Sequence, residues 1–252
     1  MLAEFHAEQR TQSVDYVEVR LSPRRFLDGG FTLNAFLSTA HTFFSRWTDP
    51  VVRGILLVNR DSSDQYIDHI ESAISAGGLP SSIVGLDLAG DERKFPESGR
   101  FTHLYASARA AGLGLTAHAG ESGGPEQVWR AIDELGARRI GHGVSAGRSR
   151  SLLRRLAADQ IMIEVSLGSS EALGAVRAAT DHPLPIFIDC GVPVSFSTDT
   201  PINTGLTLAD EMLLARRCLG VDEEALWKMQ SRAAAFAFDS DVVLAASRDL
   251  KL

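Results

Sequence analysis

Short runs of aliphatic and β-branched residues alternate with helix-like segments along the chain. Seven such runs predict β-strands: 14–21 (VDYVEVRL), 54–58 (GILLV), 83–88 (IVGLDL), 113–118 (LGLTAH), 139–143 (RIGHG), 161–165 (IMIEV) and 192–198 (VPVSFST). Between two of them, residues 125–137 carry apolar side chains at helical spacing, with a proline at the start and a glycine near the end. Residues 63–78 predict a second helix that ends on a glycine pair. This alternation predicts parallel strands covered by helices, as in a doubly wound sheet or a barrel.

Polar residues at the strand ends favour the barrel. They stand at or just beyond the carboxyl ends of different strands, and they are Asp87, His118 with Glu121, His142, Glu164 and Asp199. A (β/α)8 barrel assembles its active site there, with one or two residues from each strand. A doubly wound sheet would concentrate them around one crevice. The pattern therefore predicts a TIM-type (β/α)8 barrel.

Seven strands are one too few to close such a barrel. Residues 3–12 (AEFHAEQRTQ) predict a helix that leads directly into the first recognisable strand. We therefore expect the first strand of the barrel and its helix to be missing. No Pro/Gly/Ser-rich linker divides the chain, so residues 1–252 are expected to form a single, N-terminally incomplete barrel domain.

Composition narrows the class of protein further. The chain has 252 residues, 44% of them hydrophobic, which is enough for a substantial core. A net charge of −7 argues against a nucleic-acid partner. Neither a signal peptide nor an apolar run of about 18 residues is present, so we expect no membrane partner. With only two cysteines, Cys190 and Cys218, the default location is the reducing cytoplasm.

The segment LTAHAGES (115–122) places His118 and Glu121 three residues apart, where a strand should turn into a helix. Imidazole is a good zinc ligand, and a carboxylate beside a metal can move protons. The structural alternative is a strand-end histidine and a glutamate that caps the following helix. Taken alone, the segment leaves both interpretations open.

The same segment contains GESGG, which matches the G-x-S-x-G pattern of a hydrolase nucleophile at Ser122. An aspartate and a histidine follow in the required order, for example Asp159 and His182. The pattern fixes only three letters, so a serine hydrolase is a remote alternative.

Three further motifs contain candidate site residues. GHG surrounds His142 with glycines that allow close backbone approach to a ligand. STDTP places Asp199 at the last strand end, as a metal ligand or as a helix N-cap. In DLAGDE, Gly90 offers a backbone N–H, whereas Asp91 and Glu92 are expected to be solvated.

Six motifs in order resemble the adenosine deaminase family of metal-dependent (β/α)8 hydrolases, over about residues 5–240. They are YVEVRLSP, GLDLAGDE, TAHAGE, RIGHGV, HPLPIFIDCGVPVSFSTDTP and TLADEM. The resemblance implies zinc-dependent hydrolytic deamination of adenosine or a related 6-aminopurine nucleoside, giving the 6-oxo product and ammonia. The H-x-E and P-C-x-x-C motifs of the other zinc deaminase class are absent.

The resemblance also implies roles for individual residues. His118 and Asp199 would bind zinc, and Asp199 would orient the attacking hydroxide. Glu121 would protonate the purine N1, and His142 would help to deprotonate the water. Gly90 would donate its backbone N–H to the purine N3.

Three departures from the family pattern stand beside these roles. The family's His-x-His pair, which supplies two zinc ligands, occurs nowhere in this sequence, so His118 and Asp199 are fewer ligands than the usual three. Thr200 replaces the second aspartate of STDDP, which contacts the purine N7. SLGSS (166–170) replaces a CPTSN-like segment.

These departures keep a second hypothesis open, a catalytically impaired or dead scaffold of the same family. An incomplete barrel would expose strand edges and part of its apolar interior, so we also expect self-association into homo-oligomers.

Overall fold

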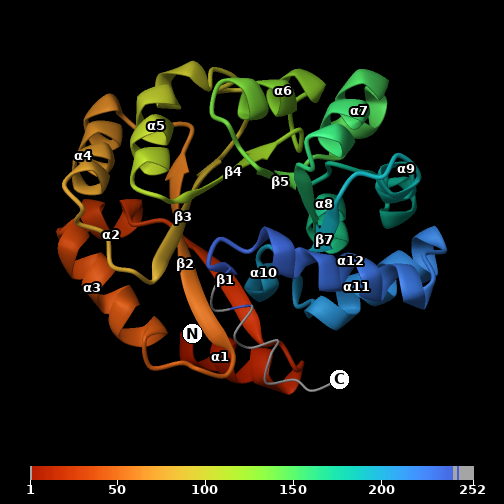
Figure 1. Cartoon of the computed structure of the whole chain (residues 1–252), viewed down its shortest axis with the longest axis horizontal. Helices are drawn as coiled ribbons and strands as arrows, with labels where there is room; N and C mark the ends of the chain where they lie inside the picture. Colours follow the sequence, from red (N-terminus) through yellow and green to blue (C-terminus); the bar gives the residue numbers. More distant parts are fainter. Residues whose placement is uncertain (1, 241–242, 244–252) are drawn as a thin grey trace. The chain divides into compact units, whose positions relative to one another are not determined.

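The computed structural model of the chain describes residues 2–240 and residue 243. Its strands are parallel, and each pairs with the next one in sequence, in the order β1 to β7 (Figure 1). The strands are β1 (Tyr16–Leu21), β2 (Val51–Asn59), β3 (Ile83–Ala89), β4 (Gly114–Ala119), β5 (Arg139–His142), β6 (Met162–Val165) and β7 (Val194–Phe196). All seven predicted strands are confirmed. A doubly wound sheet reverses its strand order at a switch point, so this consecutive order favours the barrel.

Helices connect the strands. The α-helices are α1 (Leu2–Thr11), α2 (Arg24–Asp28), α3 (Leu33–Phe44), α4 (Asp64–Ser75), α5 (Thr102–Ala110), α6 (Pro125–Asp133), α7 (Arg150–Ala158), α8 (Leu167–Ala172), α9 (Leu184–Asp189), α10 (Pro201–Thr204), α11 (Leu208–Leu219) and α12 (Glu223–Ala233). Short 3-10 helices are η1 (Gly99–Phe101), η2 (Val144–Arg148), η3 (Ala179–Asp181) and η4 (Ala234–Phe236). No helix among the described residues is both long enough and apolar enough to cross a bilayer.

The helix ends follow the chemistry of their boundary residues. Helix α6 begins at Pro125 as predicted, and Gly136, which follows its end, has the left-handed φ of +69° that glycine adopts easily. The Ser63 side chain accepts the N–H of Tyr66 and starts α4. Helix α11 begins with a reciprocal capping box between Thr207 and Asp210.

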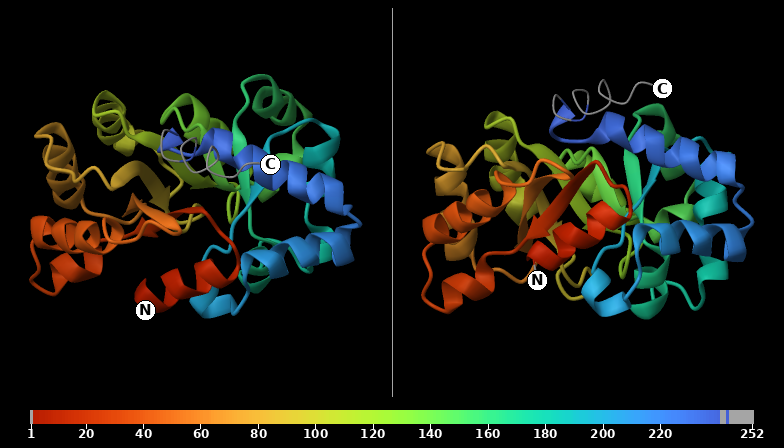
Figure 2. Two further views of the ribbon diagram at one scale, coloured as in Figure 1. Left: turned by 60° about the horizontal axis from the view of Figure 1, so that its bottom comes forward. Right: turned by 90° about the horizontal axis from the view of Figure 1, so that it is seen from below.

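The chain divides into two compact units. The first contains the described residues of Met1–Ala89, Arg100–Leu115 and Ala237–Leu252. Strand β2 lies between β1 and β3 in this unit, and its Ile55 and Leu56 are completely buried. Helix α3 packs on β2, and α5 packs on β3 and on α4; Figures 1 and 2 show these three helices on the same side of the two strands.

The second unit contains Gly90–Gly99 and Thr116–Phe236. All residues of β5 and β6 are buried, as expected for parallel strands covered on both faces. Helix α12 packs along β7. The loops that follow β4, β5, β6 and β7 all belong to this unit, and they position the site described below.

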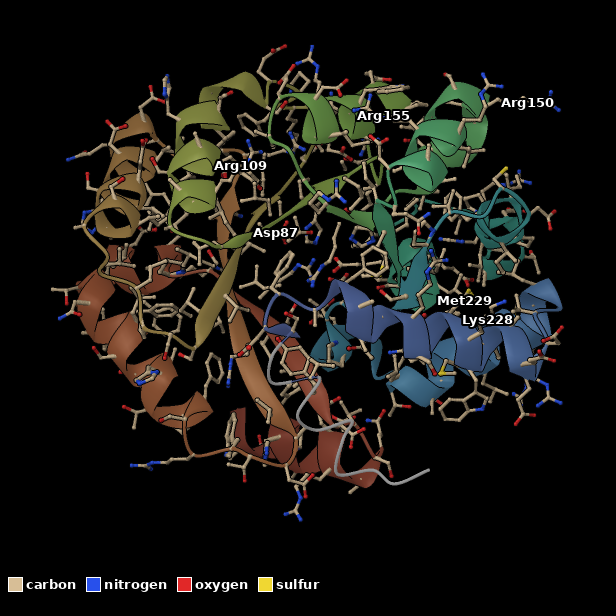
Figure 3. The ribbon with its side chains drawn as sticks, in the orientation of Figure 1. Asp87, Arg109, Arg150, Arg155, Lys228 and Met229 are labelled. Carbon is tan, nitrogen blue, oxygen red and sulfur yellow. The ribbon has the colours of Figure 1, made fainter. Side chains whose placement is uncertain are left out.

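Two of the polar strand residues form buried ion pairs. In the first unit, Asp87 on β3 (Figure 3) is fully buried and accepts a hydrogen bond from the Arg20 guanidinium. In the second, Arg139 Nε lies 2.8 Å from Glu164 Oε1, and both side chains are buried. Removing one partner would leave the other charge buried and uncompensated, so single substitutions at these positions are expected to destabilise the sheet.

Phe238 packs directly against the backbone of two strands in the first unit. A Cβ added at Gly114 would lie 2.0 Å from Phe238 Cδ1, and one added at Gly85 would lie 2.5 Å from Cδ2. The backbone N–H of Phe238 donates to Glu18 Oε1 at 2.7 Å, which fixes the segment that carries the ring. The two glycines are therefore required by close packing.

Because the ring and a methyl group cannot share this space, Gly114→Ala is expected to lower the free energy of unfolding by about 1–3 kcal/mol. In a Phe238→Ala background the same substitution should cost much less, which a double-mutant cycle by urea denaturation measures. Gly99→Ala is the control, because the nearest atom to its added Cβ lies at 3.9 Å. Equal costs of Gly114→Ala in both backgrounds would contradict the packing argument.

Candidate functional site

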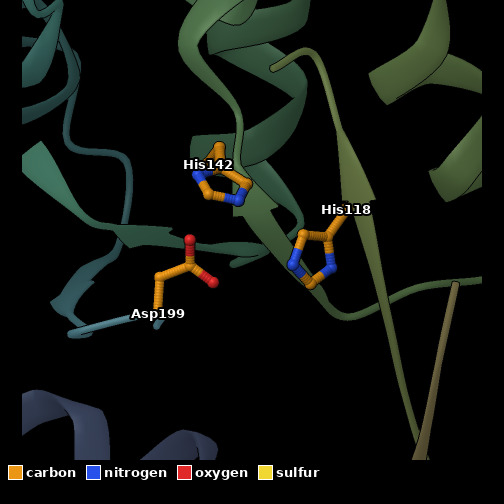
Figure 4. A group of neighbouring side chains, drawn as sticks. All are labelled: His118, His142 and Asp199. Carbon is orange, nitrogen blue, oxygen red and sulfur yellow. The ribbon is translucent and has the colours of Figure 1, made fainter. Parts of the chain in front are cut away.

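Two histidines and an aspartate converge in the second unit. His118 comes from the end of β4, His142 is the last residue of β5, and Asp199 follows β7. One potential ligand atom from each lies within 4.8 Å of the others. Figure 4 shows the three side chains pointing toward a common space. The structure therefore brings together three predicted site residues that lie up to 81 positions apart in the sequence.

The local backbone is specialised around this group. His142 and Asp199 have left-handed φ angles of +63° and +53°, which are uncommon outside glycine. The His118 ring lies against Gly141 of the neighbouring strand, where an added Cβ would be 3.2 Å from the ring. The two imidazole rings have their centroids 5.1 Å apart. Strained residues of this kind persist where the surrounding structure holds them, and they cluster at functional sites.

Glu121 lies beside the group. Its Oε1 is 3.6 Å from Nε2 of His142. Burial raises the pKa of the Glu121 carboxyl above its ordinary value; His118 opposes the shift, and the carboxylates of Asp199 and Glu92 add to it. A carboxyl with a raised pKa retains its proton closer to neutral pH, so Glu121 is suited to act as an acid.

Glu92 is the first site residue that sequence reasoning missed. Expected to be solvated, it is only 2% exposed, so this expectation is wrong. Its carboxylate accepts the backbone N–H groups of residues 120–123. Asp91 and Glu92 stand side by side and look alike in the sequence, but only Asp91 remains at the surface, capping its own turn.

Ser169 and Glu211 were also missed. The Ser169 hydroxyl donates a hydrogen bond to Asp199 Oδ2. Glu211 is fully buried and accepts the N–H of Leu167 at 2.6 Å and that of Gly168 at 3.1 Å. Burial raises the pKa of Glu211 to about 7, although the two N–H groups oppose the shift. Glu211 therefore holds the turn that carries Ser169 to the aspartate.

The two predicted substrate-binding residues, Gly90 and Thr200, lie in segments that follow strands β3 and β7. Gly90 directly follows β3 and has a φ of +117°, a conformation that residues with a side chain rarely adopt. Thr200 is exposed and forms the N-cap of α10, next to Asp199 in the chain. Both therefore adjoin strand ends, as the sequence predicted.

The three residues considered for a serine hydrolase do not form a catalytic triad with one another. Ser122 Oγ accepts the backbone N–H of Glu92 at 3.2 Å. His182 is buried, and its Nδ1 accepts the N–H of Leu184. Asp159 pairs with Arg155 on its own helix. Each proposed triad member thus has a different local role.

Consecutive parallel strands with a polar site at their carboxyl ends define the class of the (β/α)8 barrels. Solved structures agree. Adenine deaminase from Arthrobacter aurescens superposes with a TM-score of 0.88 at 23% identity, covering 99% of this chain and 78% of that one. A zinc-bound amidohydrolase from Burkholderia ambifaria gives 0.85 at 21% identity, covering 98% and 70%. These likenesses show the fold, a barrel of which seven strands are described.

Sequence comparison identifies the family within that class. Residues 1–247 match the family described as adenosine deaminase. The adenosine deaminase of Yersinia pseudotuberculosis is 42% identical over 167 residues, which are 66% of this chain and 50% of that protein. That of Salmonella typhimurium is 43% identical over 160 residues, or 64% and 48%. The chain belongs to the adenosine deaminase family, and it spans about half the length of the curated relatives it matches.

His182 gives the chain a measurable acid sensitivity. Burial lowers the pKa of this imidazole to about 4, from an unfolded value near 6.5. Between those values the unfolded chain binds a proton and the native chain does not, so stability falls as the pH drops from 6.5 towards 4, by roughly 3 kcal/mol.

Substitution His182→Asn tests this expectation, because the amide oxygen replaces Nδ1 as acceptor and does not titrate. Chemical denaturation at pH 7.5 and pH 4.5 should give a smaller pH-dependent loss in the variant than in the wild type. Parallel losses in the two proteins would show that His182 is not the buried titrating group.

Proposed function

We propose that the chain catalyses the zinc-dependent hydrolytic deamination of adenosine or a related 6-aminopurine nucleoside. The observation that carries this proposal is the convergence of His118, His142 and Asp199 beside Glu121, whose raised pKa suits an acid. Membership of the adenosine deaminase family supports it.

The donor set fits zinc. Imidazole and carboxylate are both ligands that zinc accepts, and His142 stands beside them as a potential third where catalytic zinc sites commonly use three protein ligands. The related amidohydrolase from Burkholderia ambifaria contains zinc. We assign His118 and Asp199 as ligands. When bound, zinc lowers the pKa of water to roughly 7 and so supplies hydroxide at neutral pH.

The chain's own residues then handle the protons. Glu121, in its protonated form, donates to the purine N1, which makes C6 electrophilic. His142 accepts a proton from the attacking water, and the 3.6 Å between its Nε2 and Glu121 Oε1 supports a joint role for the two groups. His142 then passes the water proton to the amino group, so that the C6–N bond breaks with release of ammonia. The second water proton returns to Glu121, and the product carries oxygen at C6 and the donated proton at N1.

A purine substrate is supported by several of the relatives. Solved structures of similar fold include an N6-methyl-AMP deaminase from Arabidopsis thaliana and complexes with IMP and GMP. In this chain we assign the N–H of Gly90 to the purine N3. We assign Thr200, which stands where the family has an aspartate, to the purine N7, so this position is expected to set which aminopurine is accepted.

The wider setting completes the proposal. We place the protein in the cytoplasm, as a single barrel domain over residues 1–252 that self-associates. Its partner is a small purine nucleoside, and neither a nucleic acid nor a membrane is expected.

Elemental analysis of dialysed protein should find about one zinc per chain. His118→Ala and Asp199→Asn should each reduce this content severalfold, because they remove ligands. Glu121→Gln and the distant His182→Asn should retain it. Loss of zinc in His142→Asn would add His142 as a third ligand, and a wild-type protein without zinc would favour the catalytically dead scaffold.

Ammonia release from a panel of aminopurine nucleosides tests the reaction itself. Glu121→Gln should lower kcat by at least about 100-fold, because the amide cannot protonate the ring. Glu126→Gln is the matched control; it makes the same change five positions later, on an exposed side chain of α6. The proposal fails if the zinc-loaded wild type turns over none of the panel, or if Glu121→Gln matches its rate.

A further inference from the structure

Glu92 lies beneath the loop that carries Glu121, and no role in the reaction has been assigned to it. We propose that Glu92 is a positioning residue, which holds loop 120–123 in one conformation and thereby fixes the Glu121 carboxyl beside His142. The proposal rests on the proposed function for its consequence in catalysis, but the clamp itself is a property of the structure.

The clamp consists of five hydrogen bonds between two segments about 30 residues apart. Glu92 Oε1 accepts the N–H of Gly120 at 2.6 Å. Its Oε2 accepts the N–H groups of Glu121, Ser122 and Gly123 at 2.9, 2.9 and 3.0 Å. In return, Ser122 Oγ accepts the backbone N–H of Glu92 at 3.2 Å. Charge-assisted bonds of this kind are stronger than neutral ones, and here they converge on one buried carboxylate.

These bonds give acceptors to backbone N–H groups that lie beyond the end of the strand. Strand β4 ends at Ala119 and α6 begins at Pro125, so residues 120–123 lie outside both hydrogen-bond ladders. Buried N–H groups without acceptors are costly, and the Glu92 carboxylate removes that cost. On the carbonyl side, Gly120 O accepts the N–H of Ser145 at 2.8 Å. The loop is thus fixed through both its N–H and its C=O groups.

The close fit leaves little freedom for rearrangement. A Cβ added at Gly123 would lie 3.1 Å from Glu92 Cβ, and one added at Gly120 would lie 2.5 Å from Ser145 Oγ. Glu121 therefore leaves a rigid backbone, and its side chain reaches His142. Reacting groups lose much of their rate advantage when misplaced by about 1 Å, so the loop conformation should affect kcat more than KM.

Glu92 itself is not available to a ligand. Four N–H donors occupy its two oxygens, and the side chain is only 2% exposed. Its contribution to catalysis therefore has to pass through the loop, which distinguishes it from Glu121.

The test compares Glu92→Gln with Asp91→Asn. The glutamine is isosteric, but one of its two terminal atoms is an N–H donor that must face backbone N–H groups, so at least one bond of the clamp is lost. The control makes the same charge change one residue earlier, at a carboxylate that accepts the N–H groups of Arg93 and Lys94 and not those of the loop. Both zinc-loaded full-length variants are examined by hydrogen–deuterium exchange, by steady-state kinetics and for zinc content.

In Glu92→Gln we expect amides 120–123 to exchange at least about tenfold faster. The kcat should fall more than about tenfold, with KM within about threefold and zinc content unchanged. Asp91→Asn should match the wild type in all three measurements. Unchanged exchange of amides 120–123 would overturn the clamp, and faster exchange with unchanged kcat would overturn its role in positioning Glu121.

The proposed function is judged separately, on the wild type. If the wild type does not deaminate any aminopurine, the proposed function fails and the positioning role fails with it. The exchange rates then still decide whether Glu92 holds the loop.

Discussion

The candidate site depends on the pairing of β4 with β5. In this register His118 stands opposite Gly141, and Ala119 stands opposite His142. The missing side chain at Gly141 leaves the space that the His118 ring occupies. Because side chains alternate between the two faces of a strand, a shift of the strand register by one residue would turn His118 to the opposite face. The cluster with His142 and Asp199 would then be lost. The pairing of two short parallel strands therefore determines whether the two imidazoles lie close together.

Beyond the strand ends, buried carboxylates accept backbone N–H groups that no longer pair with a neighbouring strand. Glu92 accepts backbone N–H groups of the loop after β4, and Glu211 accepts those of Leu167 and Gly168 in the first turn of α8. Each segment carries a functional group, Glu121 in the first case and the Ser169 hydroxyl in the second. At the ends of the neighbouring strands, His142 and Asp199 have left-handed backbone φ angles. Two buried acids thus bind the backbone of the segments that carry these groups.

Hydrophobic periodicity was sufficient for the strands, because their buried runs are local in sequence. For β2 the predicted strand begins at Gly54, whereas the observed strand begins at Val51. The residues from Val51 to Arg53 also pair with β1, but the polar Arg53 interrupts the apolar run on which the prediction was based. The same periodicity placed His118, His142 and Asp199 at strand ends, and parallel strands bring such ends together. Glu92 and Glu211 could not be found in this way. Their partners lie about 30 and 44 residues away, and nothing in the local sequence distinguishes an acid that meets buried amides from one that meets water.

The GESGG segment is compatible in sequence with two kinds of site, a serine nucleophile at Ser122 or an acid at Glu121, and hydrogen bonds of its backbone distinguish them. A serine nucleophile at a strand–turn–helix junction needs the N–H of the following residue to stabilise an oxyanion. Here that residue is Gly123, and its N–H already donates to Glu92 Oε2 at 3.0 Å. The Ser122 hydroxyl, in turn, accepts the Glu92 N–H. One buried carboxylate thus occupies a backbone donor that an acyl-transfer site would require, and the same carboxylate binds the N–H of the neighbouring Glu121. Ser122 therefore has a structural role, because its own N–H and that of Gly123 donate to Glu92 and are not available to an oxyanion.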